Sequence, residues 1–190
     1  CKGTFDGYDF DCVGPVDRYV IATRGREGVI SQMERQFNQT SDKSIAYNNR
    51  GIAKSNLGDY ARAIDDYTNA IKLDPNYAYA YNNRGNAKSN RGDYSGAIDD
   101  YTNAIKLDPN YANAYNNRGY AKRKIRDYSG AIDDCTNAIK LDPNFAYAYY
   151  NRGSSKSYLS DYKGACDDYK IAIKFGYKVN EKWFSTFCKN

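Results

Sequence analysis

A 34-residue unit, repeated four times without a gap, constrains this sequence more than any other feature. The unit begins at Ser44 with SIAYNNRGIAKSNLGDYARAIDDYTNAIKLDPNY and begins again at Ala78, Ala112 and Ala146. The register is constant, because one aspartate recurs every 34 positions, at Asp59, Asp93, Asp127 and Asp161. A fixed period of this length is typical of a solenoid, in which each unit is too small to bury its apolar face alone and packs on its neighbours. Function is therefore expected on the surfaces of a stacked array.

Each unit is predicted to form two helices joined by a short turn. In the second helix, Ala63, Tyr67 and Ala70 are spaced to give one apolar stripe. Gly58 is expected to end the first helix in the left-handed conformation, and Asp59 is placed to cap the second helix.

The length of the unit, with Ala63, Tyr67, Ala70 and Pro75 spaced as they are, resembles the tetratricopeptide repeat (TPR) family. The resemblance covers residues 44–179. It implies an all-α fold, a right-handed superhelical solenoid of helix-turn-helix pairs whose first helices line a concave groove. The expected order is an N-terminal arm (1–43), four repeats (44–77, 78–111, 112–145 and 146–179) and a C-terminal capping helix (180–190).

Each repeat departs from the family pattern at two positions. Arg50 and its equivalents stand where leucine is usual, and Lys54 and its equivalents stand where tyrosine is usual. We expect each arginine to reach an aspartate of the second helix, within the pairs 65/66, 99/100, 133/134 and 167/168, and to serve packing. Repeats three and four also lose the turn glycine, which is replaced by Arg126 and Ser160.

The arm is predicted to hold a short loop, an extended segment at 18–22 and a helix with apolar residues at 30, 33 and 37 that caps repeat one. A disulfide between Cys1 and Cys12, which bracket the loop, is expected in an oxidising compartment. Asn38 begins the only N-x-S/T sequon and is a candidate glycosylation site.

Three cysteines remain. Cys135 and Cys166 occupy core positions of their repeats and are expected to behave as buried hydrophobic residues. The alternative is a disulfide, either Cys135–Cys166 or Cys166–Cys188, and the sequence does not decide between the two.

The final segment restarts the repeat register, with Trp183 at the position of Tyr47. It is expected to form an incomplete first helix whose aromatic surface stays partly exposed. Together with aromatic residues of the arm, it supplies the candidate assembly ends, which are Phe5, Tyr8, Phe10, Trp183, Phe184 and Phe187.

Composition excludes several classes of enzyme. Histidine is absent, so no Ser-His-Asp or Cys-His catalytic arrangement and no histidine-containing zinc site can form. We therefore expect no catalytic site, no metal and no cofactor.

Residues 1–17 carry one lysine and four aspartates, a net charge of −3. Residues 112–190 carry 14 basic and 8 acidic residues, a net charge of +6. Nucleic-acid binding would normally require a stronger, continuous basic patch.

The family resemblance implies a groove surface rich in tyrosine, asparagine and serine, which combines rigid aromatic area with adaptable hydrogen bonds, as in antibody paratopes. Recent duplication of one unit is an alternative explanation for the repeated residues. The surface lacks the regularly spaced lysines with which chaperone-binding TPR domains hold a C-terminal carboxylate. The candidate groove residues are Ile45, Asn48, Ile52, Tyr79, Asn82, Asn86, Asn113, Asn116, Tyr120, Tyr147, Tyr150 and Ser154.

These observations predict a non-enzymatic, extracellular or cell-surface scaffold that associates head to tail with its own copies, the acidic arm docking on the basic end of another chain. A cytoplasmic location is the alternative. Since the sequence begins at Cys1, a lipid anchor there is a further expectation; no run of 18 apolar residues indicates a transmembrane segment. The alternatives for function are an adaptor that binds a peptide of another protein in its groove, a carbohydrate-binding module, and an arm that folds back into its own groove.

Overall fold

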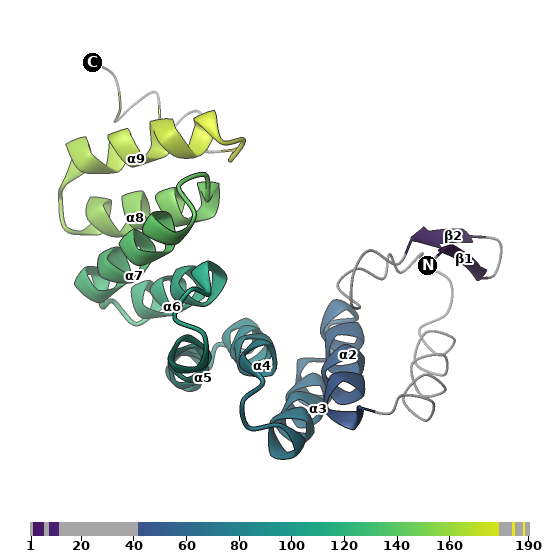
Figure 1. Cartoon of the computed structure of the whole chain (residues 1–190). Coiled ribbons are helices and arrows are strands. Elements are labelled where there is room, and N and C mark those ends of the chain that lie inside the picture. The colour runs from purple at the N-terminus through teal and green to yellow at the C-terminus, as the bar shows by residue number, and fades with distance from the viewer. Residues whose placement is uncertain (1, 6–7, 12–41, 179–183, 185–187, 189–190) are drawn as a thin grey trace. The chain divides into compact units, whose positions relative to one another are not determined.

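The computed structural model describes residues 2–5, 8–11, 42–178, 184 and 188 (Figure 1). The chain divides into two compact units, residues 1–87 and residues 88–190, and each is described by itself.

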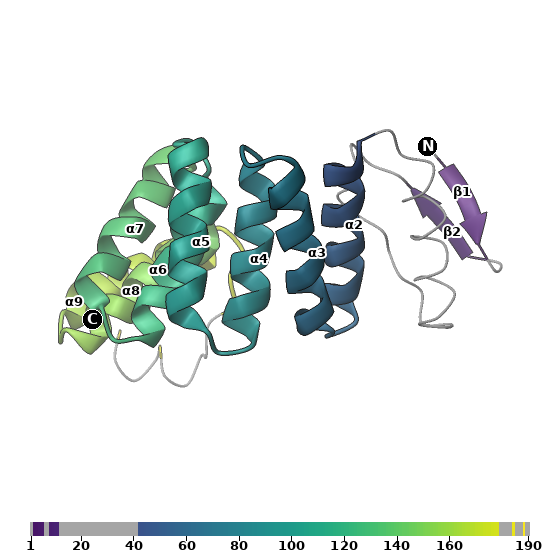
Figure 2. The same ribbon diagram turned by 90° about the horizontal axis from the view of Figure 1, so that it is seen from below.

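Eight helices make up the described repeat region, which confirms the predicted all-α class. In the first unit α2 packs on α3, and in the second unit each helix from α5 to α9 packs on the next, while α6 also contacts α8. Figure 2 shows α5 to α8 side by side. The helices are α2 (Lys43–Asn56), α3 (Tyr60–Leu73), α4 (Ala78–Asn90), α5 (Tyr94–Leu107), α6 (Ala112–Lys124), α7 (Tyr128–Leu141), α8 (Ala146–Tyr158) and α9 (Tyr162–Lys174).

The predicted aspartate caps are confirmed in all four repeats. The carboxylate of Asp59 accepts a hydrogen bond from the backbone N–H of Arg62 at 3.2 Å. The equivalent carboxylates accept from Gly96, Gly130 and Gly164, each at 2.9 Å. Each bond satisfies one of the backbone donors that a helix N-terminus leaves without a partner.

The left-handed turn before each cap is also confirmed, and it persists without glycine. Gly58 and Gly92 have φ angles of 78° and 85°, while Arg126 and Ser160 have φ angles of 68° and 65° at the same position. A non-glycine residue is strained in this region of backbone space. Repeats three and four therefore keep the turn at a conformational cost.

The core is a layer of alanines with one large side chain in most repeats. Ala63, Tyr67 and Ala87 form the core cluster of the first unit, and Ala97, Tyr101 and Ala121 form a second cluster. A Cβ atom on Gly51 would lie 2.6 Å from Cε1 of Tyr67, so only glycine allows the first helix to approach this ring. Small residues in one helix thus make room for the ring of the next.

A buried aspartate holds two basic residues of the preceding helix. Arg50 donates two hydrogen bonds to Asp66, at 3.0 and 2.7 Å, and Lys54 lies 2.7 Å from the same carboxylate. Arg118 pairs in the same way with Asp134, and Arg152 with Asp168. The predicted packing role of these arginines is thereby confirmed.

The same arginine position also joins successive repeats. Arg118 donates to the hydroxyl of Thr102 at 3.1 Å, and Arg152 donates to that of Thr136 at 3.3 Å. A planar guanidinium with five donors can make both sets of bonds at once, which explains why arginine replaces the usual leucine here.

The N-terminal arm corrects one prediction. Residues expected to form a short loop instead form an antiparallel hairpin of β1 (Lys2–Phe5) and β2 (Tyr8–Asp11), in which Phe5 is opposite Tyr8. The intervening dipeptide in the sequence is Asp-Gly, a signal for two-residue hairpins that the loop prediction did not use. The expected extended segment and helix of the arm, Cys1, Cys12 and Asn38 lie outside the described residues.

The C-terminal segment is tied to α9 by a disulfide between Cys166 and Cys188. Of the two alternative bridges this is the one that forms, so Cys166 is not a free buried thiol, whereas Cys135 is both free and buried. The backbone N–H of Cys188 donates to the carbonyl of Phe184 at 2.8 Å. Trp183, Phe187 and the rest of the predicted capping helix lie outside the described residues.

Candidate interaction face on the first helices

The predicted groove residues fall into three classes of exposure. The members with exposed side chains include Tyr79 and Tyr147, with 54% and 60% of their surface accessible. The exposed residues are Ile45, Tyr79, Asn113 and Tyr147; the half-buried ones are Ile52, Asn86, Tyr120 and Tyr150; the buried ones are Asn48, Asn82, Asn116 and Ser154.

Two of the buried asparagines join adjacent first helices. The amide of Asn83 donates to the side-chain oxygen of Asn48 at 3.0 Å, and the amide of Asn151 donates to that of Asn116 at 2.9 Å. Because a buried amide without a partner is costly, this pairing accounts for asparagine at these positions without a ligand. A ligand on this face would meet the exposed and half-buried side chains first.

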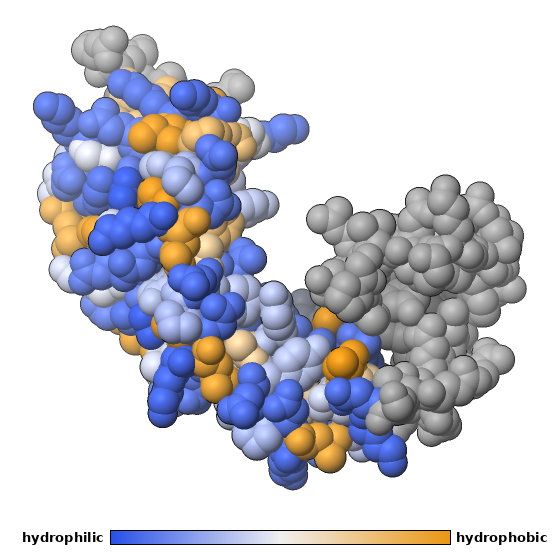
Figure 3. Space-filling view, viewed as in Figure 1, coloured by the Kyte–Doolittle hydropathy of each residue, from blue (hydrophilic) through white to orange (hydrophobic). Residues whose placement is uncertain are grey.

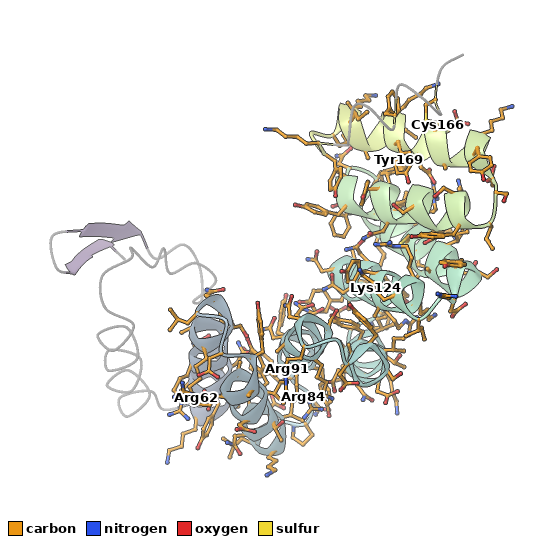
Figure 4. The ribbon with its side chains drawn as sticks, turned by 180° about the vertical axis from the view of Figure 1, so that it is seen from behind. Arg62, Arg84, Arg91, Lys124, Cys166 and Tyr169 are labelled. Atoms are coloured by element: carbon orange, nitrogen blue, oxygen red, sulfur yellow. A yellow bond between two sulfur atoms is a disulfide. The ribbon has the colours of Figure 1, made fainter. Side chains whose placement is uncertain are left out.

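Four tyrosines gather around α8, and we call them the aromatic face: Tyr147, Tyr150, Tyr169 and Tyr177. The ring of Tyr177 stacks on that of Tyr150 with centroids 4.2 Å apart, and it meets the ring of Tyr147 edge-on at 5.0 Å. Tyr169 is 5% exposed and lies beneath, with its centroid 5.7 Å from that of Tyr150. Figure 4 labels Tyr169, whose ring projects from α9 toward α8.

The turn after α9 brings Tyr177 to this face. Gly176 has a φ angle of 88°, and the N–H of Tyr177 donates to the carbonyl of Ala172 at 2.9 Å, which closes a left-handed helix end. Burial, followed by the effect of Tyr150, raises the pKa of Tyr177 to about 12. Like any tyrosine, it is neutral at physiological pH and remains a hydrogen-bond donor.

Two basic residues lie at the end of α6, and one of them, Arg123, is close enough to the aromatic face to act on the pKa of Tyr169 and of Tyr177. The charged groups of Arg123 and Lys124 each lie 5.3 Å from the ring centroid of Tyr120. Figure 4 marks Lys124 on this helix. The basic excess of repeat three and the change of Leu-Asp-Pro-Asn to Phe-Gly-Tyr-Lys at 175–178 were the sequence signals for this region. The groove prediction nevertheless omitted Arg123, Lys124 and Tyr177.

On the face that Figure 3 shows, the hydrophobic residues of the described part lie as separate spots among hydrophilic ones. Within the residues that the structure describes, no cluster of acidic or cysteine side chains is arranged to hold a metal ion. None of the described helices is long and apolar enough to cross a membrane.

Comparison with known proteins assigns the family. The model of the tetratricopeptide repeat matches residues 44–77, 78–111 and 112–145. The chain belongs to the tetratricopeptide repeat family. TPR proteins are typically non-enzymatic interaction modules, and membership makes this chain a protein-interaction scaffold. No curated protein matches it.

Solved structures share the fold. The crystal structure of MamA is 23% identical with a TM-score of 0.71, and the match covers 79% of this chain and 88% of that one. A structure of MamA 41-end from Desulfovibrio magneticus RS-1 is 23% identical with a TM-score of 0.70, and the match covers 79% of this chain and 85% of that one. The structure of the first TPR of Spaghetti (RPAP3) bound to the HSP90 peptide SRMEEVD is 26% identical with a TM-score of 0.62. That match covers 64% of this chain and 96% of that one.

Proposed function

We propose that this TPR scaffold is non-enzymatic and extracytoplasmic, and that it associates with its own copies. In this proposal the aromatic face of one chain receives the acidic N-terminal arm of another. The observation that carries it is the position of the aromatic face, which belongs to the part of the chain with a net charge of +6, while the first 17 residues carry −3. Opposite charges steer such an encounter and favour this orientation over others.

The aromatic face suits an occupant of this composition. Tyrosine offers large, rigid contact area at low conformational cost, and its hydroxyl forms hydrogen bonds at the rim of a contact. The arm carries aromatic residues at Phe5, Tyr8 and Phe10 next to aspartates. Such a contact joins different surfaces of the two chains, so it produces a ring if the rotation closes and a filament if it does not.

The disulfide supports the extracytoplasmic part of the proposal. Cys166–Cys188 links two parts of the second unit. Structural disulfides persist in oxidising compartments and are rare where thiols are kept reduced.

An adaptor that binds a peptide of another protein is the second candidate. It is favoured by the likeness to the RPAP3 domain, which is 26% identical to this chain. In its structure that domain is bound to an HSP90 peptide containing three acidic residues. In this case the foreign peptide takes the place of the arm on the aromatic face.

Sedimentation velocity over a range of concentrations and salt tests self-association. We expect oligomers whose size falls as salt rises, because screening weakens the charge steering. Tyr147→Ser should weaken association, whereas Tyr158→Ser should not. Both tyrosines are on α8 and about equally exposed, at 60% and 61%, but only Tyr147 belongs to the aromatic face.

A chain that stays monomeric at every concentration would overturn self-association. The adaptor is then tested by measuring the binding of acidic, aromatic peptides to the wild-type and Tyr147→Ser chains. A glycan array tests the remaining alternative of carbohydrate binding.

A further inference from the structure

Repeat three differs from the other repeats at two positions that lie opposite each other. In repeat one the hydroxyls of Ser55 and Tyr67 are 3.2 Å apart, which joins the first helix to the second. Ser89 bonds Tyr101 in repeat two, and Tyr169 bonds serines in repeat four. In repeat three the serine is replaced by Arg123 and the tyrosine by Cys135. The pair of replacements removes a ring and introduces a guanidinium.

This guanidinium is incompletely satisfied. Nε of Arg123 is the one buried side-chain nitrogen or oxygen in the described part of the chain that has no hydrogen-bond partner. Burial raises the pKa values of Cys135, Tyr169 and Tyr177, and in each case the charge of Arg123 opposes part of that rise. The guanidinium therefore lies close to the thiol and to two tyrosines of the aromatic face. A buried donor without an acceptor calls for an explanation.

Two neighbouring basic residues, Lys124 and Arg126, also lack acidic partners within the described ranges, whereas Lys122 has one. Lys122 lies 2.9 Å from the carboxylate of Asp134, as its equivalents do in other repeats. No ion pair within the described ranges involves Arg123, Lys124 or Arg126. The C-terminal end of a helix favours cations, which accounts for positive charge here in general. It does not account for a half-buried guanidinium beside tyrosine rings.

We propose that Arg123 is the carboxylate-binding residue of the aromatic face. This inference rests on the proposed function and names the chemistry of its recognition step: an aspartate of the incoming arm accepts hydrogen bonds from Arg123, and Lys124 adds charge. A carboxylate can accept from Nε and a terminal nitrogen of a guanidinium together, so a turn of the half-buried Arg123 side chain on binding lets the aspartate supply the acceptor that Nε lacks. An aromatic residue on the other face of the same strand then packs on Tyr147 and Tyr177.

The arm sequence fits this arrangement. Tyr8-Asp9-Phe10-Asp11 places a carboxylate beside an aromatic residue twice in four positions. These four residues form β2, whose successive side chains alternate between the two faces of the strand, so one face offers carboxylates to Arg123 and the other offers rings to the tyrosines. The occupant is therefore a segment with acidic and aromatic residues in alternation.

A double variant, Arg123→Ser with Cys135→Tyr, tests the assignment in the full-length chain. It restores the serine–tyrosine pair of the other repeats, and Gly119 still provides the small position that Gly51 provides beside Tyr67. We expect the variant to fold with an unchanged or higher Tm and to self-associate about tenfold or more weakly. Arg126→Ser is the matched control, because it removes an equal charge from an exposed turn and introduces the residue found at that position in repeat four.

A second change identifies the carboxylate. Asp9→Asn with Asp11→Asn in the arm should weaken association to a similar extent, and combining it with the Arg123 and Cys135 changes should add little, because both remove the same contact. Additive losses, unchanged association of the Arg123→Ser/Cys135→Tyr chain, or an equal loss in Arg126→Ser would overturn the proposal.

Titration with a synthetic peptide of residues 1–17, with serine at both cysteines, tests the Arg123 assignment separately from the proposed function. Binding to the wild-type chain that weakens in the double variant supports the Arg123 assignment. Equal binding to both chains overturns that assignment and leaves the proposed function standing. A wild-type chain that neither binds the peptide nor self-associates overturns both.

Discussion

The first two repeats and the last two share their buried ionic contacts but differ at their turns. Asp66 in repeat one and Asp134 in repeat three hold the same arginine and lysine, at closely similar distances. The turn residue is glycine in repeats one and two, but Arg126 and Ser160 in repeats three and four. Positions that contact a neighbouring repeat must present the same shape each time, because every repeat packs on a similar one. The turn residues lie outside those contacts and are free to differ.

The buried aspartates provide the largest expected effect. Asp134→Ala would leave Arg118 and Lys122 without their shared carboxylate, and loss of one partner of a buried pair costs about 3–5 kcal/mol. Asp66→Ala should cost a similar amount in the first unit. Urea denaturation followed by circular dichroism measures both.

Adjacent aspartates give a matched control for this comparison. Asp65 and Asp133 are exposed, so their replacement by alanine should change the free energy of unfolding by no more than about 0.5 kcal/mol. Unequal losses for Asp66→Ala and Asp134→Ala would show that the shared contacts are not equivalent in energy.

The Cys166–Cys188 disulfide should make α9 more sensitive to reductant than α2. Cys188→Ser opens a link between residues separated by 22 positions, and the closed-loop entropy predicts a loss of about 3 kcal/mol. Calorimetry should show a lower Tm, and reduced wild-type protein should behave as the variant does. Hydrogen exchange should become faster in α9 and stay unchanged in α2. Faster exchange throughout both units would contradict a local effect.

Exchanging the turn residues between repeats should change the stability of the chain by a smaller amount, with opposite signs in repeats one and two and in repeats three and four. Arg126→Gly and Ser160→Gly should each stabilise the chain by about 1 kcal/mol, because glycine adopts a positive φ without strain. Gly58→Ala and Gly92→Ala should destabilise it by about the same amount. A Cβ atom at either glycine would meet nothing within 4 Å, so these changes report backbone conformation alone. Stabilisation by Gly58→Ala would refute this explanation.

Alkaline pH should destabilise the chain through Cys135 and through Tyr67, its counterpart in repeat one. Burial raises the pKa of Cys135 from 9.0 to about 12 and that of Tyr67 from 10.0 to about 12. A pKa that is higher in the folded chain means that folding favours the protonated form. Each contribution to stability is complete below the unfolded pKa and is lost as pH rises toward about 12.

Near neutral pH these groups produce no stability change, so thiol reactivity is the more direct measurement. We expect Cys135 to react with a thiol reagent at pH 8 only as fast as the chain opens, since the thiolate is the reactive form. Prompt reaction of the folded Cys135→Ser chain would show that another thiol is accessible. Prompt reaction of the wild type alone would contradict the burial of Cys135.

The sequence determined the repeat, its helices, their aspartate caps and the reach of Arg50 to the second helix. These features depend on short spacings and on a period that every copy repeats, so one unit is enough to infer them. The sequence also identified repeats three and four as divergent, although it did not indicate that Arg126 and Ser160 would keep the left-handed turn.

Only the tertiary structure decided which side chains are open and which are paired. Asn48 and Asn116 look like surface residues in a groove, yet each bonds an asparagine 35 positions later and is buried. Cys166 looks like a core residue, yet it is bonded to Cys188. Tyr177 reaches the aromatic face because Gly176 reverses the chain. These contacts join residues on different segments of the chain, so they depend on how neighbouring segments pack, which the period of the sequence does not specify.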